Sequence, residues 1–257
     1  MTQEGHTYCK RVPAHHDSET ADRTAQSVPF PPSLPDSLSD PELINRNDWE
    51  SFNQIAQLEN HWERGPWPAD RRTYFWYLTF RDVALTELAA QCQSQLDSEN
   101  LDLVPLDGLH ITVLRIGNQD EVENSQILAV VNNAKSLLRN FQPFEISVGP
   151  LSGSRGAIRF SISPWDGLFE LHRVVHKAVS KSVPELDMPD TERFRPHLGI
   201  GYSNRIQPSD RLIKKVDTLR DLAPVSVCVD NVKLVTLRRE FGTYRWDEIA
   251  TLKLGSD

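Results

Sequence analysis

The sequence is poor in cysteine. Its three cysteines, Cys9, Cys92 and Cys228, lie far apart, show no C-x-x-C spacing and are odd in number. A small disulfide-stapled domain needs an even and closely spaced set, so this pattern argues against a disulfide framework. A reducing compartment fits such cysteine usage, and we expect a cytoplasmic protein.

Long apolar runs are also missing. No stretch approaches the roughly 18 apolar residues that a membrane helix needs, and the polar N-terminus lacks the apolar core of a signal peptide. The chain has 257 residues, of which 39% are hydrophobic and 25% are charged, which is ordinary for a soluble globular protein. We expect a soluble monomer with no membrane partner.

The sequence also lacks an excess of basic residues. Lysine and arginine number 28 against 36 aspartates and glutamates, which gives a net charge of -8. The chain therefore lacks the basic footprint of a protein that coats long nucleic acid. A small nucleotide or one end of an RNA stays open as a ligand, because a local cationic pocket can form in an acidic protein.

Residues 1–45 differ in composition from the rest of the chain. They hold six prolines and much Ser, Thr and Asp, and the run "VPFPPSLPD" favours polyproline II. We predict a disordered tail over 1–45 and a helical lead-in over 46–72. Its helix is expected from about Asp48 to Trp62, capped by Asn47 or Asp48.

Residues 73–257 read as one α+β domain built from a repeated unit. Apolar periodicity predicts strand, helix, strand, helix, strand in each half, with lobes at about 73–149 and 157–238 and a final strand over 245–254. Thr73 then corresponds to about Ala157, and His110 to His197, at offsets of 84 and 87. A duplication of this kind would bring the equivalent strands together about a pseudo-two-fold axis.

His110 and His197 lie in these equivalent strands, within "PLDGLHITVLRIG" and "RFRPHLGIGYSN". Side chains two apart on a strand share a face, so Thr112 projects beside His110. A hydroxyl and an imidazole suit a phosphate oxygen. If the two histidines face each other, one can accept a proton while the other donates one, without a cofactor or metal.

These two motifs resemble those of the two-histidine (2H) phosphoesterase superfamily, and its bacterial 2'-5' RNA ligase-like branch in particular. The flanking "TYFWYLTF" and the terminal "YRWDEIATLKLG" are also similar, so the resemblance spans about Thr73 to Gly255. It implies a bilobal, LigT-like fold with two antiparallel sheets lining a central cleft and helices outside. It further implies hydrolysis or transfer at 2',3'-cyclic or 2'-5' phosphate esters of nucleotides or RNA ends, with His110 and His197 as catalysts and Thr112 as a phosphate ligand.

The second motif departs from the superfamily pattern, since Gly199 stands where Ser or Thr is expected. Arg195 shares the face of His197 on an undistorted strand and is our phosphate-binding candidate there, although Pro196 can kink the strand. Tyr202 and Ser203 are further candidates. The glycine also keeps a second function open, a nucleotide- or RNA-end-binding module with weakened turnover. Hydrolysis of cyclic oligonucleotides is a third.

Two other patterns have competing readings. His172 and His176 are four apart on a predicted helix, a spacing that can bind metal, but no H-E-x-x-H motif is present and we expect a solvated helix face. On the strand over 73–80, the odd-numbered aromatics Phe75 and Tyr77 share one face, and Tyr74 and Trp76 share the other. One pair is core and the other can stack a base, but the sequence does not say which.

Overall fold

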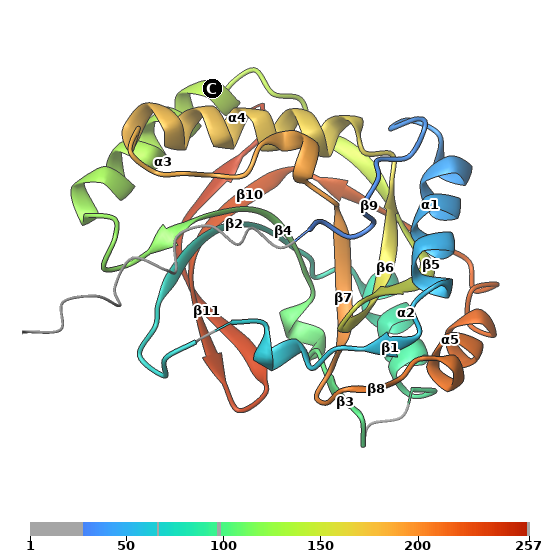
Figure 1. Cartoon of the computed structure of the whole chain (residues 1–257). Helices are drawn as coiled ribbons and strands as arrows, with labels where there is room; N and C mark the ends of the chain where they lie inside the picture. Colours follow the sequence, from blue (N-terminus) through green and yellow to red (C-terminus); the bar gives the residue numbers. More distant parts are fainter. Residues whose placement is uncertain (1–27, 66, 97–98, 256–257) are drawn as a thin grey trace, which may run out of the picture.

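The computed structural model describes residues 28–65, 67–96 and 99–255, so the first 27 residues of the tail predicted over 1–45 lie outside these ranges. The protein is α+β, with two antiparallel sheets and helices packed outside them (Figure 1). A minor two-stranded pair, β1 (Gln57–Leu58) with β8 (Gln207–Pro208), joins the lead-in to the domain. No helix in the described ranges is long and apolar enough to cross a membrane.

The first sheet has four strands in the order β11-β10-β2-β4, and all its neighbours are antiparallel. The second sheet has five strands in the order β3-β7-β6-β5-β9, again antiparallel. The strands of the first are β2 (Thr73–Thr79), β4 (His110–Asn118), β10 (Asn231–Glu240) and β11 (Thr243–Lys253). Those of the second are β3 (Leu101–Leu103), β5 (Phe144–Ser154), β6 (Ala157–Ser163), β7 (His197–Ser203) and β9 (Val225–Val229).

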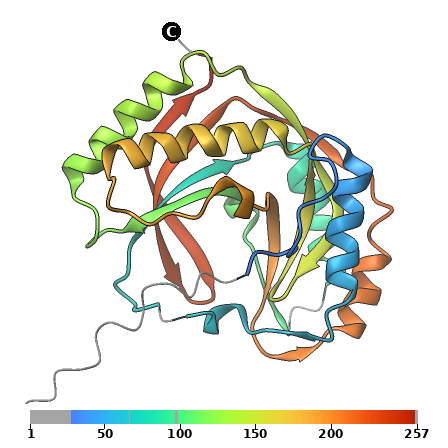
Figure 2. The same cartoon turned by 45° about the horizontal axis from the view of Figure 1, so that its top comes forward.

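The helices divide between the two sheets. Helices α3 and α4 lie side by side and contact β11 and β4 respectively, whereas the other three pack on the second sheet (Figures 1 and 2). The α-helices of the described residues are α1 (Pro41–Asn53), α2 (Val83–Gln93), α3 (Asn124–Leu138), α4 (Asp166–Ser182) and α5 (Asp210–Asp217). Three single 3-10 turns complete the set, η1 (His61–Glu63), η2 (Leu106–Gly108) and η3 (Thr191–Arg193).

The predicted repeat is present, but its two lobes are not consecutive stretches of chain. The first unit runs β2-α2-β4-α3-β5 and the second runs β6-α4-β7-α5-β9-β10. Strand β5 pairs with β6, in the sheet of the second unit, while β10 pairs with β2 in the sheet of the first. The lobes expected over 73–149 and 157–238 therefore each contribute strands to both sheets, because β3 and β5 lie in the second sheet and β10 lies in the first.

The N-terminal boundary also differs from the prediction. Helix α1 starts at Pro41, with Asp40 as the N-cap whose carboxylate accepts from two backbone N–H groups, and not at Asn47 or Asp48. Asp48 is instead buried inside this helix. Residues 28–40 are placed against the domain, where the ring of Phe30 packs on the core, so the described part of the predicted tail is a bound segment.

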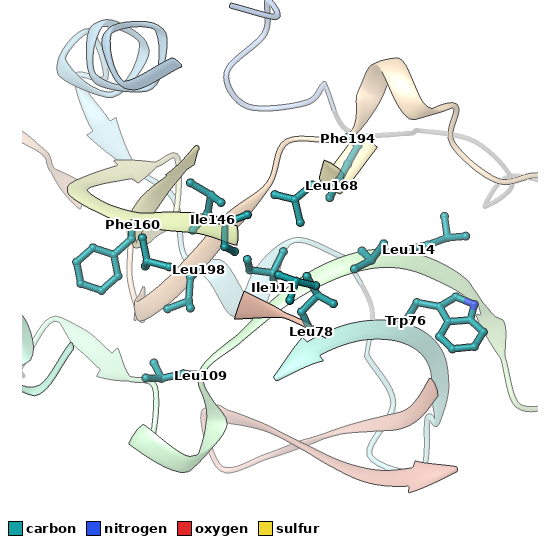
Figure 3. Close-up of a cluster of buried hydrophobic side chains, with 14 of the residues drawn as sticks. Trp76, Leu78, Leu109, Ile111, Leu114, Ile146, Phe160, Leu168, Phe194 and Leu198 are labelled. Atoms are coloured by element: carbon teal, nitrogen blue, oxygen red, sulfur yellow. The ribbon is translucent and has the colours of Figure 1, made fainter. Parts of the chain in front are cut away.

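The core lies between the sheets and under the helices. Apolar side chains from β2, β4, β5, β6, β7 and α4 meet there, including Trp76, Leu78, Ile111, Leu114, Ile146, Phe160, Leu168 and Leu198 (Figure 3). On β2 the even-numbered residues belong to this core. The odd-numbered Phe75 and Tyr77 face the other way and line a cavity. Of the two aromatic faces, the Phe75 face is therefore the one that a ligand can reach.

Candidate active site

A cavity of about 770 Å³ opens where β4 of the first repeat and β7 of the second, the two strands that begin with the histidines, come together. Both predicted histidines line it, as do Thr112 and Gly199. The surrounding side chains are mainly aromatic or basic, and they include Arg64, Arg115, Arg155, Arg159, Arg193, Trp67 and Tyr244. Only Glu59 and Asp190 add acidic side chains among these lining residues. A protein with a net charge of -8 thus has a basic cavity suited to an anion.

His110 is the first residue of β4, and its ring orientation is fixed on two sides. Its Nδ1 lies 2.8 Å from the carbonyl oxygen of Gly108. The ring stacks on Tyr77 at a centroid distance of 4.4 Å, and Trp246 meets it edge-on at 5.3 Å. Because a carbonyl only accepts, Nδ1 must carry the hydrogen, and the neutral ring keeps Nε2 as its acceptor.

His197 repeats this arrangement in the second unit. It is the first residue of β7, and its Nδ1 lies 2.7 Å from the carbonyl oxygen of Arg195. In both repeats, therefore, the histidine donates to the backbone carbonyl two residues earlier. Each neutral ring presents Nε2 as a proton acceptor, and each gains a proton at Nε2 when it becomes charged.

Burial shifts the titration of both rings in the same direction. It lowers the pKa of His110 below its usual 6.5. It lowers the pKa of His197 to about 3, with a further contribution from the positive charge of Arg159. Both histidines are therefore neutral in the free protein at pH 7, and a bound anion would favour the charged form of either.

Thr112 lies opposite Tyr77 in the β2–β4 pairing, which places the two side chains next to each other. The threonine is half-buried and lines the cavity on the same strand face as His110. Tyr77 itself is buried, which raises the pKa of its phenol well above the usual range and keeps it protonated. The first repeat thus presents a hydroxyl pair beside its histidine.

Arg195, the predicted phosphate ligand, lines the cavity and is also hydrogen-bonded to backbone carbonyls. Its Nε donates to the carbonyl of Pro31 at 3.0 Å, and its terminal nitrogens donate to the carbonyls of Pro32, Glu192 and Phe194. Arg195 also precedes β7, which starts at His197, so strand alternation does not govern its direction. Through the Pro31 and Pro32 carbonyls, its guanidinium anchors the segment that leads to α1.

Arg159 is a lining residue that sequence reasoning missed. It lies directly opposite Gly199 in the β6–β7 pairing, and its guanidinium contacts the Asp48 carboxylate at 3.2 Å and the Phe30 carbonyl at 3.1 Å. Both members of this ion pair are almost fully buried, at 2% and 1% exposure. Among the described residues, its Nε has no hydrogen-bond partner. The sequence signal was a charged residue within the apolar run "AIRFSIS".

The His172 and His176 pair does not form the solvated face that we expected. His172 is buried, with Nδ1 2.9 Å from the Thr191 hydroxyl and its ring stacked on Phe194 at 4.9 Å. That expectation was wrong because this face of α4 is covered by the η3 segment. In the described part of the chain, no group of three or more His, Cys, Asp or Glu side chains is arranged to hold a metal ion.

A family model of the 2'-5' RNA ligase superfamily matches residues 81–240. The chain belongs to this superfamily. The match contains both histidine motifs, the whole second sheet, and β4 and β10 of the first, so the family expected from the two motifs is confirmed. A search of curated proteins finds no match to this sequence.

Solved structures agree on the fold. TT0787 of Thermus thermophilus superposes with a TM-score of 0.55 at 16% identity, covering 72% of this chain and 99% of that one. E. coli LigT complexed with NADP+ gives a TM-score of 0.54 at 15% identity, covering 73% of this chain and all of LigT. A structure titled only as a phosphoesterase gives 0.53 at 16% identity, covering 71% and 98%. The 2H phosphoesterase fold is therefore shown, and this chain is longer than the part it shares with these structures.

Proposed function

We propose that this protein is a phosphodiesterase that hydrolyses 2',3'-cyclic or 2'-5' phosphodiester bonds of nucleotides or RNA ends, with no metal in the reaction. The observation that carries the proposal is the matched pair of histidines. Each repeat contributes one imidazole whose Nδ1 is fixed on a backbone carbonyl, and both imidazoles line one basic cavity. Two such groups can move both protons that hydrolysis of a phosphodiester requires.

In the proposed reaction, the Nε2 of one neutral histidine accepts a proton from water as the water oxygen forms a bond to phosphorus. The bond between phosphorus and the leaving ribose oxygen breaks, and the other histidine donates its Nε2 proton to that oxygen. Hydrolysis of a 2',3'-cyclic phosphate then gives a phosphomonoester and a free hydroxyl. One protonated and one neutral histidine are needed at the start, and the roles are exchanged at the end.

Electrostatics favour His197 as the base. The positive charge of Arg159 disfavours an imidazolium at His197, whereas burial is the only cause found for the lowered pKa of His110. A phosphate anion bound between the rings would raise both pKa values, and His110 would be the first to take the proton. His110 is then the acid that protonates the leaving oxygen.

Two features support binding of a nucleotide phosphate. The Thr112 hydroxyl can donate to a non-bridging phosphate oxygen, and the basic side chains around the cavity offset its charge. Phe75 and Tyr77 add apolar ring surface on the cavity wall, where a base can stack. Among proteins of the same fold, E. coli LigT has been solved in complex with 3'-AMP.

The test is turnover in the presence of EDTA. We would offer 2',3'-cyclic AMP, a 2'-5'-linked dinucleotide and a 3'-5'-linked control, and follow the phosphomonoester or nucleoside product. The proposal predicts turnover of the first or second substrate, unaffected by EDTA and much faster than of the control. A folded protein with equal turnover of all three, or with turnover abolished by EDTA, would contradict it.

Gly199 favours a second candidate, a binding module for nucleotides or RNA ends with weakened turnover. It removes the hydroxyl that the second motif supplies elsewhere in the superfamily. Binding of 3'-AMP without turnover of any of these substrates would select this candidate. Turnover of a cyclic dinucleotide in preference to a 2',3'-cyclic nucleotide would instead select hydrolysis of cyclic oligonucleotides, which uses the same two histidines.

A further inference from the structure

Nothing in the backbone requires a glycine at position 199. Its φ is not in the left-handed region, unlike those of Gly149 and Gly242. A Cβ built on Gly199 would meet its nearest neighbour, the hydroxyl oxygen of Tyr202, at 3.5 Å, which is ordinary van der Waals contact. A serine side chain would therefore fit at position 199. The Tyr202 hydroxyl lies next to the space that this side chain would occupy.

A β-bulge brings Tyr202 to this place. Gly199 pairs with Arg159, but Gly201 pairs with the adjacent Ile158, so Ile200 is an extra residue on β7. Such a bulge shifts the alternation of side chains by one. Simple alternation puts Tyr202 on the face opposite His197, whereas after the bulge it lines the same cavity as His197.

The ring of Tyr202 is fixed by an aromatic cluster. His61 stacks on it at a centroid distance of 4.1 Å, and Trp62 and Tyr244 contact it edge-on at 5.3 and 5.6 Å. His61 is in turn held by a 3.0 Å contact between its Nε2 and the Tyr244 hydroxyl. Among the described residues, the Tyr202 hydroxyl itself has no hydrogen-bond partner, so its donor is unused.

We propose that the Tyr202 hydroxyl replaces the missing Ser or Thr of the second motif and donates a hydrogen bond to the substrate phosphate beside His197. This inference rests on the proposed function of the same cavity and names a catalytic residue that the motif pattern does not contain. Thr112 in one repeat and Tyr202 in the other would then hold the phosphate from two sides.

Protonation fits this role. Burial, together with the neighbouring Tyr244, raises the pKa of Tyr202 above its usual range. The phenol therefore stays protonated throughout the pH range in which the histidines work, and it is a permanent donor.

Two other candidates near the motif, Ser203 and Arg195, already make hydrogen bonds within the protein. The Ser203 hydroxyl is buried, donates to the Arg205 carbonyl at 2.8 Å and accepts from Gln207 at 2.9 Å. Arg195 holds the backbone of the N-terminal segment. Arg159 contributes charge opposite Gly199; one terminal nitrogen is shared between Asp48 and Phe30, and its Nε has no hydrogen-bond partner among the described residues, but it supplies a cation and not a neutral hydroxyl.

The test compares Tyr202→Phe, Gly199→Ser and the double variant with wild type. We would measure kcat/KM for 2',3'-cyclic AMP and the Kd for 3'-AMP, and confirm folding by thermal unfolding. Because a hydrogen bond to a charged group is lost, Tyr202→Phe should lower kcat/KM about 10- to 100-fold and weaken 3'-AMP binding. The serine in the double variant should restore a large part of both. Tyr74→Phe is the matched control, because it removes a hydroxyl from the core face of β2, away from the cavity, and it should change kcat/KM less than about threefold.

Two results would overturn the inference. One is a folded Tyr202→Phe protein with kcat/KM and Kd within twofold of wild type. The other is a loss in Tyr202→Phe that the serine does not restore at all, which would make the tyrosine a support for the cavity wall. If the wild type itself lacks turnover, the proposed hydrolysis fails, and the 3'-AMP titration of the same four variants still decides whether Tyr202 binds the phosphate.

Discussion

The two repeats meet at one cavity with the same histidine geometry but different neighbours. In the first, Thr112 stands beside His110 and is paired with Tyr77. In the second, Gly199 stands beside His197 and is paired with Arg159. The difference shows which part of the duplicated unit the chemistry constrains. The imidazole and its backbone carbonyl are kept in both, while the phosphate contacts are free to diverge.

The fifth residue after each histidine shows the same divergence. Both β4 and β7 carry one extra residue between the motif and this position, so Arg115 in the first repeat corresponds to Tyr202 in the second. Arg115 is exposed and donates to the Asn118 side chain at 3.1 Å, whereas Tyr202 is buried in an aromatic cluster. The first repeat therefore keeps its hydroxyl within the motif, and the second offers one from three residues farther along the strand.

The largest effect should come from the histidines, where the two repeats are alike. Replacing His110 or His197 by glutamine removes one of the two proton transfers and should lower kcat by about 10²- to 10⁴-fold in each case. Single-turnover kinetics with 2',3'-cyclic AMP would measure it, and circular dichroism would confirm the fold. A loss in only one of the two variants would show that the repeats are not catalytically equivalent.

The next largest effect should come from the buried ion pair between Asp48 and Arg159, the residue opposite Gly199 of the second motif. Asp48→Ala leaves the Arg159 guanidinium buried without its carboxylate, which should lower the free energy of unfolding by about 3–5 kcal/mol. Urea denaturation would measure it. The control is Glu59→Ala, which breaks the half-exposed pair with Arg64 and should cost less than about 1 kcal/mol. Equal losses in the two variants would contradict this view of the Asp48 pair.

Removing the Thr112 hydroxyl of the first repeat should lower activity less than removing a histidine. Thr112→Val keeps the shape of the side chain but removes the donor, and it should lower kcat/KM about 10- to 100-fold. Thr112→Ser keeps the hydroxyl and should stay within a few-fold of wild type. If both variants match wild type, the first repeat does not hold the phosphate through Thr112.

The pH dependence should be the mildest of these effects. Because burial lowers the pKa of both histidines in the free protein, the fraction with one protonated ring falls as pH rises above 6. The kcat/KM should therefore be highest on the acidic side of pH 6.5 and decline by up to about tenfold per unit above it. The decline of kcat should occur at higher pH than the decline of kcat/KM, because the bound phosphate of the substrate favours the charged imidazolium. A kcat/KM that rises toward pH 8 would contradict the lowered pKa values.

Local patterns in the sequence predicted much of this molecule. The strands that carry His110 and His197 were expected, and so was the repeat that brings them together. The missed start of α1 also had a local signal, since Asp40 before Pro41 is a capping pattern. Its position inside a proline-rich stretch led us to extend the tail too far.

The remaining differences depend on non-local pairing. The exchange of β5 and β10 between the sheets follows from which strand edges meet in the folded chain, and neither strand's own sequence encodes it. The bulge at Ile200 is set in the same way by its partner strand, and alternation alone would put Tyr202 on the wrong face. The carbonyls of Pro31 and Pro32 that Arg195 contacts could not be foreseen either, because they lie more than 160 residues away in the chain.

The central claim is that one histidine from each repeat forms a single acid–base unit. The most direct measurement compares the kcat of wild type, His110→Ala, His197→Ala and the double variant on 2',3'-cyclic AMP. If the two act as a unit, the double variant should be about as slow as either single variant, because removing one proton transfer already disables the pair. Losses that multiply, with the double variant far slower than both singles, would show that the two histidines act independently and would contradict this account.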